Sequence, residues 1–287
     1  MKKSYKYSYL IAFIFILVGI VISVIGLAVG GFEIKNYTTR SYEKKEVSVE
    51  AAEITKIITD IVSSDINIVY KDIDEINITY YEEENEVYQI KTDNGQLKII
   101  YEDNRKWYQR ISFGFYIENN ITIELPKDMK VDLDLNTVSG VINVSDIISD
   151  VVKIKNVSGE IEVKNIQAES VVIKSTSGEM DIRNIQAENV VIEGKSGDVN
   201  VNGGVGDIIS IKTISGEISV NKIEYNDITL SSTSGEIEGT IIGNESDYNI
   251  SSDTVSGDNN LRDNIDGDRS KRLTVNTTSG GIDINFR

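Results

Sequence analysis

A recurring Ser-Gly pair divides most of the chain into segments of nearly equal length. The first five intervals between pairs are 19 residues long, and the last two are 22 and 23 residues. A fixed period near 20 residues indicates stacked structural repeats. Glycine suits the tight or left-handed turn that the corner of such a repeat needs. The pairs assigned to these structural turns are Ser139-Gly140, Ser158-Gly159, Ser177-Gly178, Ser196-Gly197, Ser215-Gly216, Ser234-Gly235, Ser256-Gly257 and Ser279-Gly280.

Between the pairs, apolar side chains recur in two short alternating runs. Counted from each Ser as position zero, positions 3, 5, 13 and 15 are apolar, and positions 4, 6 and 16 are mainly polar. A period of two is typical of a strand with one buried face. Each repeat is thus predicted to be strand, corner, strand, corner. Such a unit cannot bury its apolar face alone, so successive repeats should stack in parallel and place Val163, Ile182 and Val201 one above the next.

The sequence therefore predicts an all-β fold, a parallel β-solenoid similar to a β-helix, with two-strand rungs of about 19 residues. The same spacing continues upstream with Ser63-Ser64 in place of Ser-Gly, which puts Ile76 and Ile78 in the second strand of that rung. Between this rung and the regular repeats, Asp93-Asn94-Gly95 predicts a β-hairpin. We expect residues 80–118 to be an insertion that caps one end of the stack, because open strand edges invite aggregation.

One transmembrane α-helix is predicted before the solenoid. Residues 10–31 carry no charge and follow Lys2, Lys3 and Lys6, and a run of this length is enough to cross a bilayer. The positive-inside rule then places residues 1–9 in the cytoplasm and the bulk of the chain outside the cell membrane. A cleaved signal peptide is the alternative reading. Gly26 and Gly30 could pack two such helices into a dimer, although two glycines in an apolar helix need no such role.

These patterns give the domain organisation that we expect. It consists of a cytoplasmic N-terminus (1–9), a transmembrane helix (10–31), a linker or first strand (32–50), N-terminal rungs with the capping insertion (51–135) and the regular repeat solenoid (136–287).

The amino-acid composition limits the kinds of catalytic site and binding partner that the chain can have. The chain has no Cys and no His, so disulfides, thiolate nucleophiles and imidazole bases are all excluded. Its formal net charge is −17, and a strongly acidic protein is repelled by the phosphate backbone of nucleic acids. No motif indicates a catalytic residue or a cofactor. A carbohydrate-active enzyme remains a distant alternative, because outward carboxylates are common here and paired carboxylates can cleave glycosides.

One polar position recurs with the repeat. Position 2 carries a carboxylate in five successive repeats, which in a stack would repel one another by about 0.9 kcal/mol per neighbouring pair in water. Pairing with Lys155, Lys174 and Lys212 at position 16 would offset this repulsion. The alternative is that the row binds Ca²⁺ or a cationic ligand. The candidate residues are Glu160, Glu179, Asp198, Glu217 and Glu236.

The repeat unit resembles that of the toast-rack family, also called "putative-adhesin" β-strand-repeat proteins of bacteria. The resemblance rests on units such as Ser158-Gly159-Glu160-Ile161-Glu162-Val163 and Ser177-Gly178-Glu179-Met180-Asp181-Ile182, and on the single upstream helix. It implies an exported or anchored protein, often linked to envelope-stress systems, without catalytic residues. We therefore expect a non-enzymatic scaffold or sensor accessory of the cell envelope with a membrane or envelope protein as partner. A surface adhesin or glycan-binding protein is the alternative.

Overall fold

A computed structural model describes residues 4–29, 42–106, 119–262 and 269–287. It divides the chain into two compact units, which are described separately: residues 1–41 with 104–118, and residues 42–103 with 119–287. Gly30 of the proposed helix pair, most of the 32–50 linker and residues 107–118 of the capping insertion lie outside the described residues.

The first unit contains the helix α1 (Ser4–Val29). The sequence places a helix at this point, and an α-helix forms. Within the described residues, no helix combines the length and the apolar character that crossing a membrane requires.

The second unit is mostly β. Within the described residues, 18 strands form one sheet with both parallel and antiparallel pairs. Two single-turn 3₁₀ helices, Ala51–Glu53 and Glu245–Asp247, interrupt it. The strands are β1 (Glu43–Glu50), β2 (Lys56–Ile61), β3 (Asp65–Lys71), β4 (Glu75–Glu82), β5 (Glu86–Asp93), β6 (Gln96–Asp103), β7 (Asn120–Pro126), β8 (Asp132–Ser139), β9 (Ile142–Ser145), β10 (Val151–Ser158), β11 (Ile161–Ser177), β12 (Met180–Ser196), β13 (Val199–Ser215), β14 (Ile218–Ser234), β15 (Ile237–Ile241), β16 (Tyr248–Ser256), β17 (Lys271–Ser279) and β18 (Ile282–Phe286).

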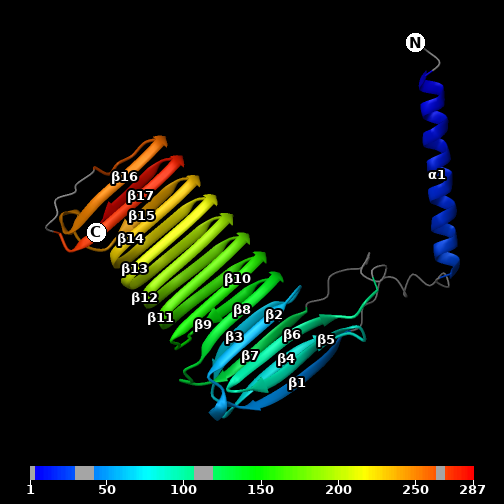
Figure 1. Cartoon of the computed structure of the whole chain (residues 1–287), viewed down its shortest axis with the longest axis horizontal. Helices are drawn as coiled ribbons and strands as arrows, with labels where there is room; N and C mark the ends of the chain where they lie inside the picture. The colour runs from blue at the N-terminus through cyan, green and yellow to red at the C-terminus, as the bar shows by residue number, and fades with distance from the viewer. Residues whose placement is uncertain (1–3, 30–41, 107–118, 263–268) are drawn as a thin grey trace. The chain divides into compact units, whose positions relative to one another are not determined.

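The middle of the sheet repeats every 19 residues, and Figure 1 shows β11 to β14 side by side in the order of the chain. Each of β11 to β14 is one coil of 17 residues whose first and second halves we call its two legs. In β11, residues 161–164 pair with β9 and residues 170–177 pair with β10, so the strand bends from one wall to the other. The registers Val163↔Ile182 and Ile182↔Val201 confirm that these side chains lie one above the next.

The core lies between the two walls. The apolar residues at positions 3, 5, 13 and 15 of the regular coils are at most 2 % exposed. Successive strand residues point to opposite faces, so the alternation in the sequence becomes alternation between core and solvent. Each buried Ile or Val side chain contributes about 1.5–3 kcal/mol, which identifies this column as the main source of stability.

The N-terminal end departs from the predicted parallel stack. β4 pairs antiparallel with β1 and β7, so Ile76 and Ile78 do not form the second strand of a parallel rung. That expectation was wrong because alternation shows a buried face but not the direction of the strand. β5 and β6 form the hairpin expected at Asp93-Asn94-Gly95, and Asn94 and Gly95 take the positive φ values of a tight hairpin turn.

The C-terminal end does not stack in the order of the chain. β17 lies between β14 and β16, and β18 pairs with β15. After β15 the chain first forms β16, which is the outer strand. It then returns as β17, which pairs with β14 on one side and with β16 on the other. The long interval between Ser256 and Ser279 serves this reversal.

The Ser-Gly corners are packed against one another. All their glycines except Gly235 have positive φ. A Cβ atom on Gly178 would lie 1.9 Å from the carbonyl oxygen of Gly159 in the preceding coil. Only a residue without a side chain permits this approach of backbone to backbone, so these residues act in the architecture.

Candidate ligand-binding groove

The chain leaves the first leg of each coil through a left-handed residue at position 7. Asp146, Asn165, Asn184 and Lys222 have φ values of 60°, 53°, 55° and 56° there. Asp and Asn adopt this conformation more readily than most residues, because their short polar side chains bond locally. The bend turns the side chains of position 7 outward in one row.

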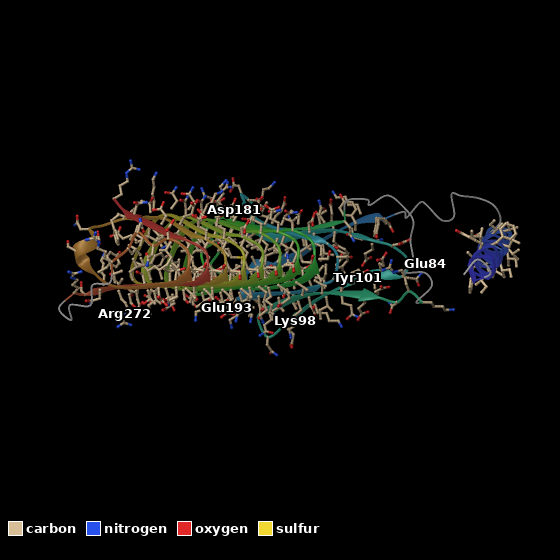
Figure 2. The ribbon with its side chains drawn as sticks, turned by 90° about the horizontal axis from the view of Figure 1, so that it is seen from above. Glu84, Lys98, Tyr101, Asp181, Glu193 and Arg272 are labelled. Atoms are coloured by element: carbon tan, nitrogen blue, oxygen red, sulfur yellow. The ribbon has the colours of Figure 1, made fainter. Side chains whose placement is uncertain are left out.

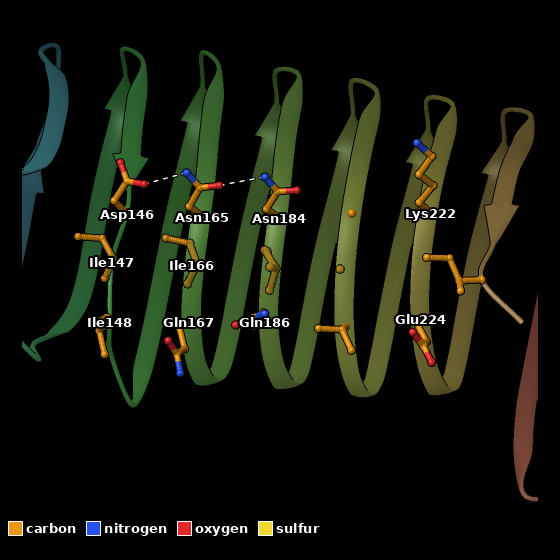
Figure 3. A pocket seen from close by; sticks show the side chains of 15 residues that line it. Asp146, Ile147, Ile148, Asn165, Ile166, Gln167, Asn184, Gln186, Lys222 and Glu224 are labelled. Atoms are coloured by element: carbon orange, nitrogen blue, oxygen red, sulfur yellow. Dashed lines mark hydrogen bonds between the residues drawn. The ribbon is translucent and has the colours of Figure 1, made fainter. Parts of the chain in front are cut away.

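Side-chain amides bond along this row, as the dashed lines in Figure 3 show. Asn165 donates from Nδ2 to Oδ1 of Asp146 at 2.7 Å, and Asn184 donates to Oδ1 of Asn165 at 2.9 Å. The row stops at the next coil, where Gly203 has no side chain. Oδ1 of Asn184 therefore faces the gap left by Gly203, since a Cβ atom there would lie 2.8 Å away.

A second polar row stands two residues further along each coil. It contains Gln167 and Gln186, both exposed, and Glu224. Between the two rows, the buried Ile166 and Ile185 form an apolar floor. The hollow has a volume of about 620 Å³. We call it the amide groove, and it is lined by Asp146, Ile147, Ile148, Asn165, Ile166, Gln167, Asn184, Ile185, Gln186, Gly203, Gly204, Val205, Lys222, Glu224 and Ile242.

The floor changes where Gly204 replaces the isoleucine of the other coils. A Cβ atom at Gly204 would lie 2.9 Å from the hydroxyl oxygen of Tyr225, so the tyrosine ring occupies the space of the missing side chain. Tyr225 is 1 % exposed, and burial raises the pKa of its hydroxyl. Within the described residues this hydroxyl has no hydrogen-bond partner. The groove thus has an unpaired polar atom directly beneath its glycine floor.

The acidic row lies elsewhere. Glu160, Glu179, Asp198, Glu217 and Glu236 follow the Ser-Gly corners and do not line the amide groove. Burial and then Glu162 raise the pKa of Glu160, and burial and then Glu238 raise the pKa of Glu217. In both cases burial is the main cause of the raised pKa, and repulsion by a neighbouring carboxylate comes second.

The lysines do not pair with this row as predicted. Within the described residues, neither Lys155, Lys174 nor Lys212 forms an ion pair with the acid of its own corner, and Lys174 instead bonds Glu193 of the next coil at 2.6 Å. The carboxylates of position 4 and the residues of position 16 stand on opposite walls, as Asp181 and Glu193 show in Figure 2. The side chains of positions 4 and 16, on either side of the corner, therefore point to solvent in different directions.

The calcium hypothesis gains no support. No group of three or more acidic side chains in the described ranges could hold a metal ion. A single row supplies one carboxylate for each coil, about 4.8 Å from the next, whereas Ca²⁺ requires six to eight converging oxygens.

The amide groove was missed in the sequence, although a signal was present. Asp, Asn and Gly recur at position 7, and these are the residues that tolerate a left-handed backbone. An exposed row of carboxamides can both donate and accept hydrogen bonds. The arrangement is suited to holding a polar ligand.

A family model places this repeat among known proteins. The model of the Toastrack DUF4097 family matches residues 54–285, which is most of the chain. The chain belongs to the Toastrack DUF4097 family. The resemblance seen in the Ser-Gly-Glu-Ile unit is confirmed, and this Toastrack chain has no match among curated proteins.

Solved structures resemble the Toastrack chain in fold. A "putative adhesin" from Bacteroides fragilis is 12 % identical with a TM-score of 0.50, over 86 % of this chain and 98 % of that chain. A "putative adhesin" from Parabacteroides distasonis is 12 % identical with a TM-score of 0.44, over 85 % and 97 %. A "putative lipid binding protein" from the same species is 16 % identical with a TM-score of 0.47, over 86 % and 98 %. None of these matches indicates a catalytic family.

Proposed function

We propose that this Toastrack protein is a non-catalytic binding scaffold of the bacterial cell envelope, and that its amide groove binds an extended, hydroxyl-rich polymer. The observation that carries the proposal is the repetition of carboxamides along a hollow. Asn165 and Asn184 form one side, and Gln167 and Gln186 form the other. Equivalent groups recur at the strand spacing of about 4.8 Å.

Each part of the groove has a complement in a neutral glycan. Hydroxyl groups donate and accept hydrogen bonds, as carboxamides do. Ile166 and Ile185 are buried between the two rows, so the carboxamides are the groups that a ligand would contact there. A repetitive ligand would meet the same pair of carboxamides in two successive coils, so that two sets of weak contacts add.

Calorimetric titration of the full chain with linear neutral oligosaccharides of increasing length tests the proposal. We expect binding that strengthens with length and is lost in the Gln167→Ala/Gln186→Ala double variant. Gln89→Ala, which changes a glutamine on the β5–β6 hairpin, serves as the matched control and should retain binding. Equal affinity of the double variant and the control would refute a role for the amide groove.

An adhesin is the second candidate, and the same groove would serve it. The difference is the source of the polymer, which would be the surface of another cell. An adhesin should agglutinate or coat foreign cells when the full chain is displayed, whereas an envelope scaffold should bind glycans of its own cell. The neighbouring "putative adhesin" structures favour this candidate only through their names.

The location is a further part of the proposal. The uncharged residues 10–31 after Lys2, Lys3 and Lys6 support attachment at the membrane, with the second unit outside the cell. We expect the full chain to stay in the membrane fraction after a high-salt wash, and a variant lacking residues 1–31 to be released. Recovery of the full chain in the wash would refute it. Crosslinking in the same membranes would identify an envelope-stress partner.

A further inference from the structure

A second groove lies on the other wall of the sheet, beside the Ser-Gly corners. It has a volume of about 620 Å³. It crosses β2, β8 and β10 and the second legs of β11, β12 and β13. We call it the lysine groove, because Lys155, Lys174, Lys195 and Lys212 line it together with Val138 and Val157. None of these residues belongs to the amide groove.

Two rows of outward side chains form its sides. In the first row, Lys174 lies beside Lys155 and beside Glu193, and Lys212 follows. The second row stands two residues further on and runs from Val138 through Val157 and Thr176 to Lys195 and Ile214. Alternate strand residues share a face, so both rows point to solvent and the residues between them point into the core.

The second row begins with exposed apolar side chains. Val138 is 46 % exposed and Val157 is 47 % exposed. Val62 continues the same row, because Ile61 pairs with Thr137, and it is 46 % exposed. Single exposed valines are ordinary, but three in line form an apolar strip that marks a contact surface, and Val138 and Val157 of this strip line the groove.

Beyond Thr176 the groove carries two lysines and the exposed Ile214, while Lys155 stands beside Val157 on β10. Lys195 and Lys212 lie on adjacent strands, are exposed, and form no ion pair within the described residues. Lys174 shares its charge with Glu193. Unpaired cations stand out in a protein whose formal net charge is −17. They provide a local site for an anion on an otherwise repulsive surface.

The two halves together specify the class of ligand. A purely apolar molecule would cover the lysines and strip them of water without compensation. A polyanion would pair with the lysines but leave the valine strip in water. We infer that the lysine groove binds one long-chain carboxylate, with its acyl chain along Val62, Val138 and Val157 and its carboxylate between Lys195 and Lys212. This inference is independent of the proposed glycan groove.

A fluorescent reporter inside the groove provides the test. The chain has no Cys, so Thr176→Cys gives a single labelling site midway between the valines and Lys195. Thr233→Cys labels the equivalent position of a coil outside the groove and serves as the control. The full chain is titrated with decanoate below its micelle concentration, with neutral decan-1-ol, and with acetate. A saturable response to decanoate at residue 176 but not at residue 233 is the expected result.

Charge variants decide whether the lysines bind the carboxylate. Lys195→Gln/Lys212→Gln should weaken decanoate binding at residue 176 by about tenfold or more, because a charge-assisted hydrogen bond contributes about 1.5–3 kcal/mol. Lys71→Gln/Lys164→Gln removes two exposed lysines that line neither groove and should leave the affinity unchanged. The inference is overturned if both double variants bind alike, if decan-1-ol matches decanoate, or if acetate displaces decanoate. All variants share α1, so any adsorption of decanoate to that helix cancels in the comparison.

Discussion

The packing of one corner glycine on the next gives a sharp prediction for Gly178→Ala. Gly178 has a φ of +149°, and an added Cβ atom would lie 1.9 Å from the carbonyl oxygen and 2.8 Å from the carbonyl carbon of Gly159. A side chain held at such a φ costs about 1–3 kcal/mol. The overlap with backbone must also be relieved by separating two paired coils. We expect Gly178→Ala to lower the free energy of unfolding by about 3 kcal/mol or more.

The same coil supplies a matched control in Gly194→Ala. Gly194 has no positive φ, and the nearest atoms to its added Cβ are Cε of Met180 at 3.1 Å and Oγ1 of Thr213 at 3.4 Å. The methionine end is flexible and can move. Replacing Gly by Ala also restricts the unfolded chain, which favours folding by about 0.4–1 kcal/mol. We expect Gly194→Ala to leave stability within about 1 kcal/mol of the parent, given these opposing effects.

Urea unfolding followed by circular dichroism measures both variants. The midpoint shifts are converted with a shared slope, provided that the slope is unchanged. Equal losses in Gly178→Ala and Gly194→Ala would refute the reasoning, because the two positions would then differ in neither backbone strain nor packing. A stable Gly178→Ala protein would show that the corners do not pack in the way described.

Three further predictions concern the core, the acidic row and the C-terminal end. Ile173 is fully buried, so Ile173→Ala should lower the free energy of unfolding by about 2–5 kcal/mol in urea titration; a smaller loss would contradict its place in the core. Burial first and then Glu238 raise the pKa of Glu217 above its ordinary 4.5, so its contribution to stability is present below pH 4.5 and lost as the pH rises. Glu217→Gln should therefore raise the melting temperature at pH 7 and have no effect at pH 4, and a gain at both would argue against titration. Deletion of residues 271–287 removes four buried apolar side chains, at Leu273, Val275, Ile282 and Ile284, and should cost about 6 kcal/mol or more; unchanged amide-exchange protection in β14 would contradict it.

The central coils could be predicted from the sequence because period and alternation act together there. The 19-residue spacing set the register that places Ile182 between Val163 and Val201, and the period of two set which side chains are buried. Both signals are local and recur in every coil, so the strand positions predicted for one coil agree with those predicted for the next.

The strand arrangement at the two ends of the sheet could not be predicted, because alternation of apolar and polar residues does not show the direction or the order of the strands. Ile76 and Ile78 alternate as they would in a parallel rung, yet β4 runs antiparallel beside β7. Likewise, the sequence of β17 does not show that this strand lies between β14 and β16. Both outcomes depend on long-range pairing, which the local pattern does not encode.

The grooves were hidden for a different reason. Each consists of residues that share a position in the repeat but differ in type from coil to coil. Gly204 and Tyr225 are unrelated in sequence, and only the packing of adjacent coils shows that one leaves space for the other. The lysines of position 16 were assigned to the acidic row because they are near in sequence, whereas Lys174 pairs with Glu193, which stands at the same position of the next coil.

The position of β17 between β14 and β16 has a consequence for how the protein is made. A ribosome releases β16 before the strand that it must join, so β16 has no neighbour until residues 271–279 follow. Until then the second leg of β14 presents bare amides and carbonyls that any passing extended chain could capture. Completion of this end therefore waits for β17 and β18, which follow β16 in the chain.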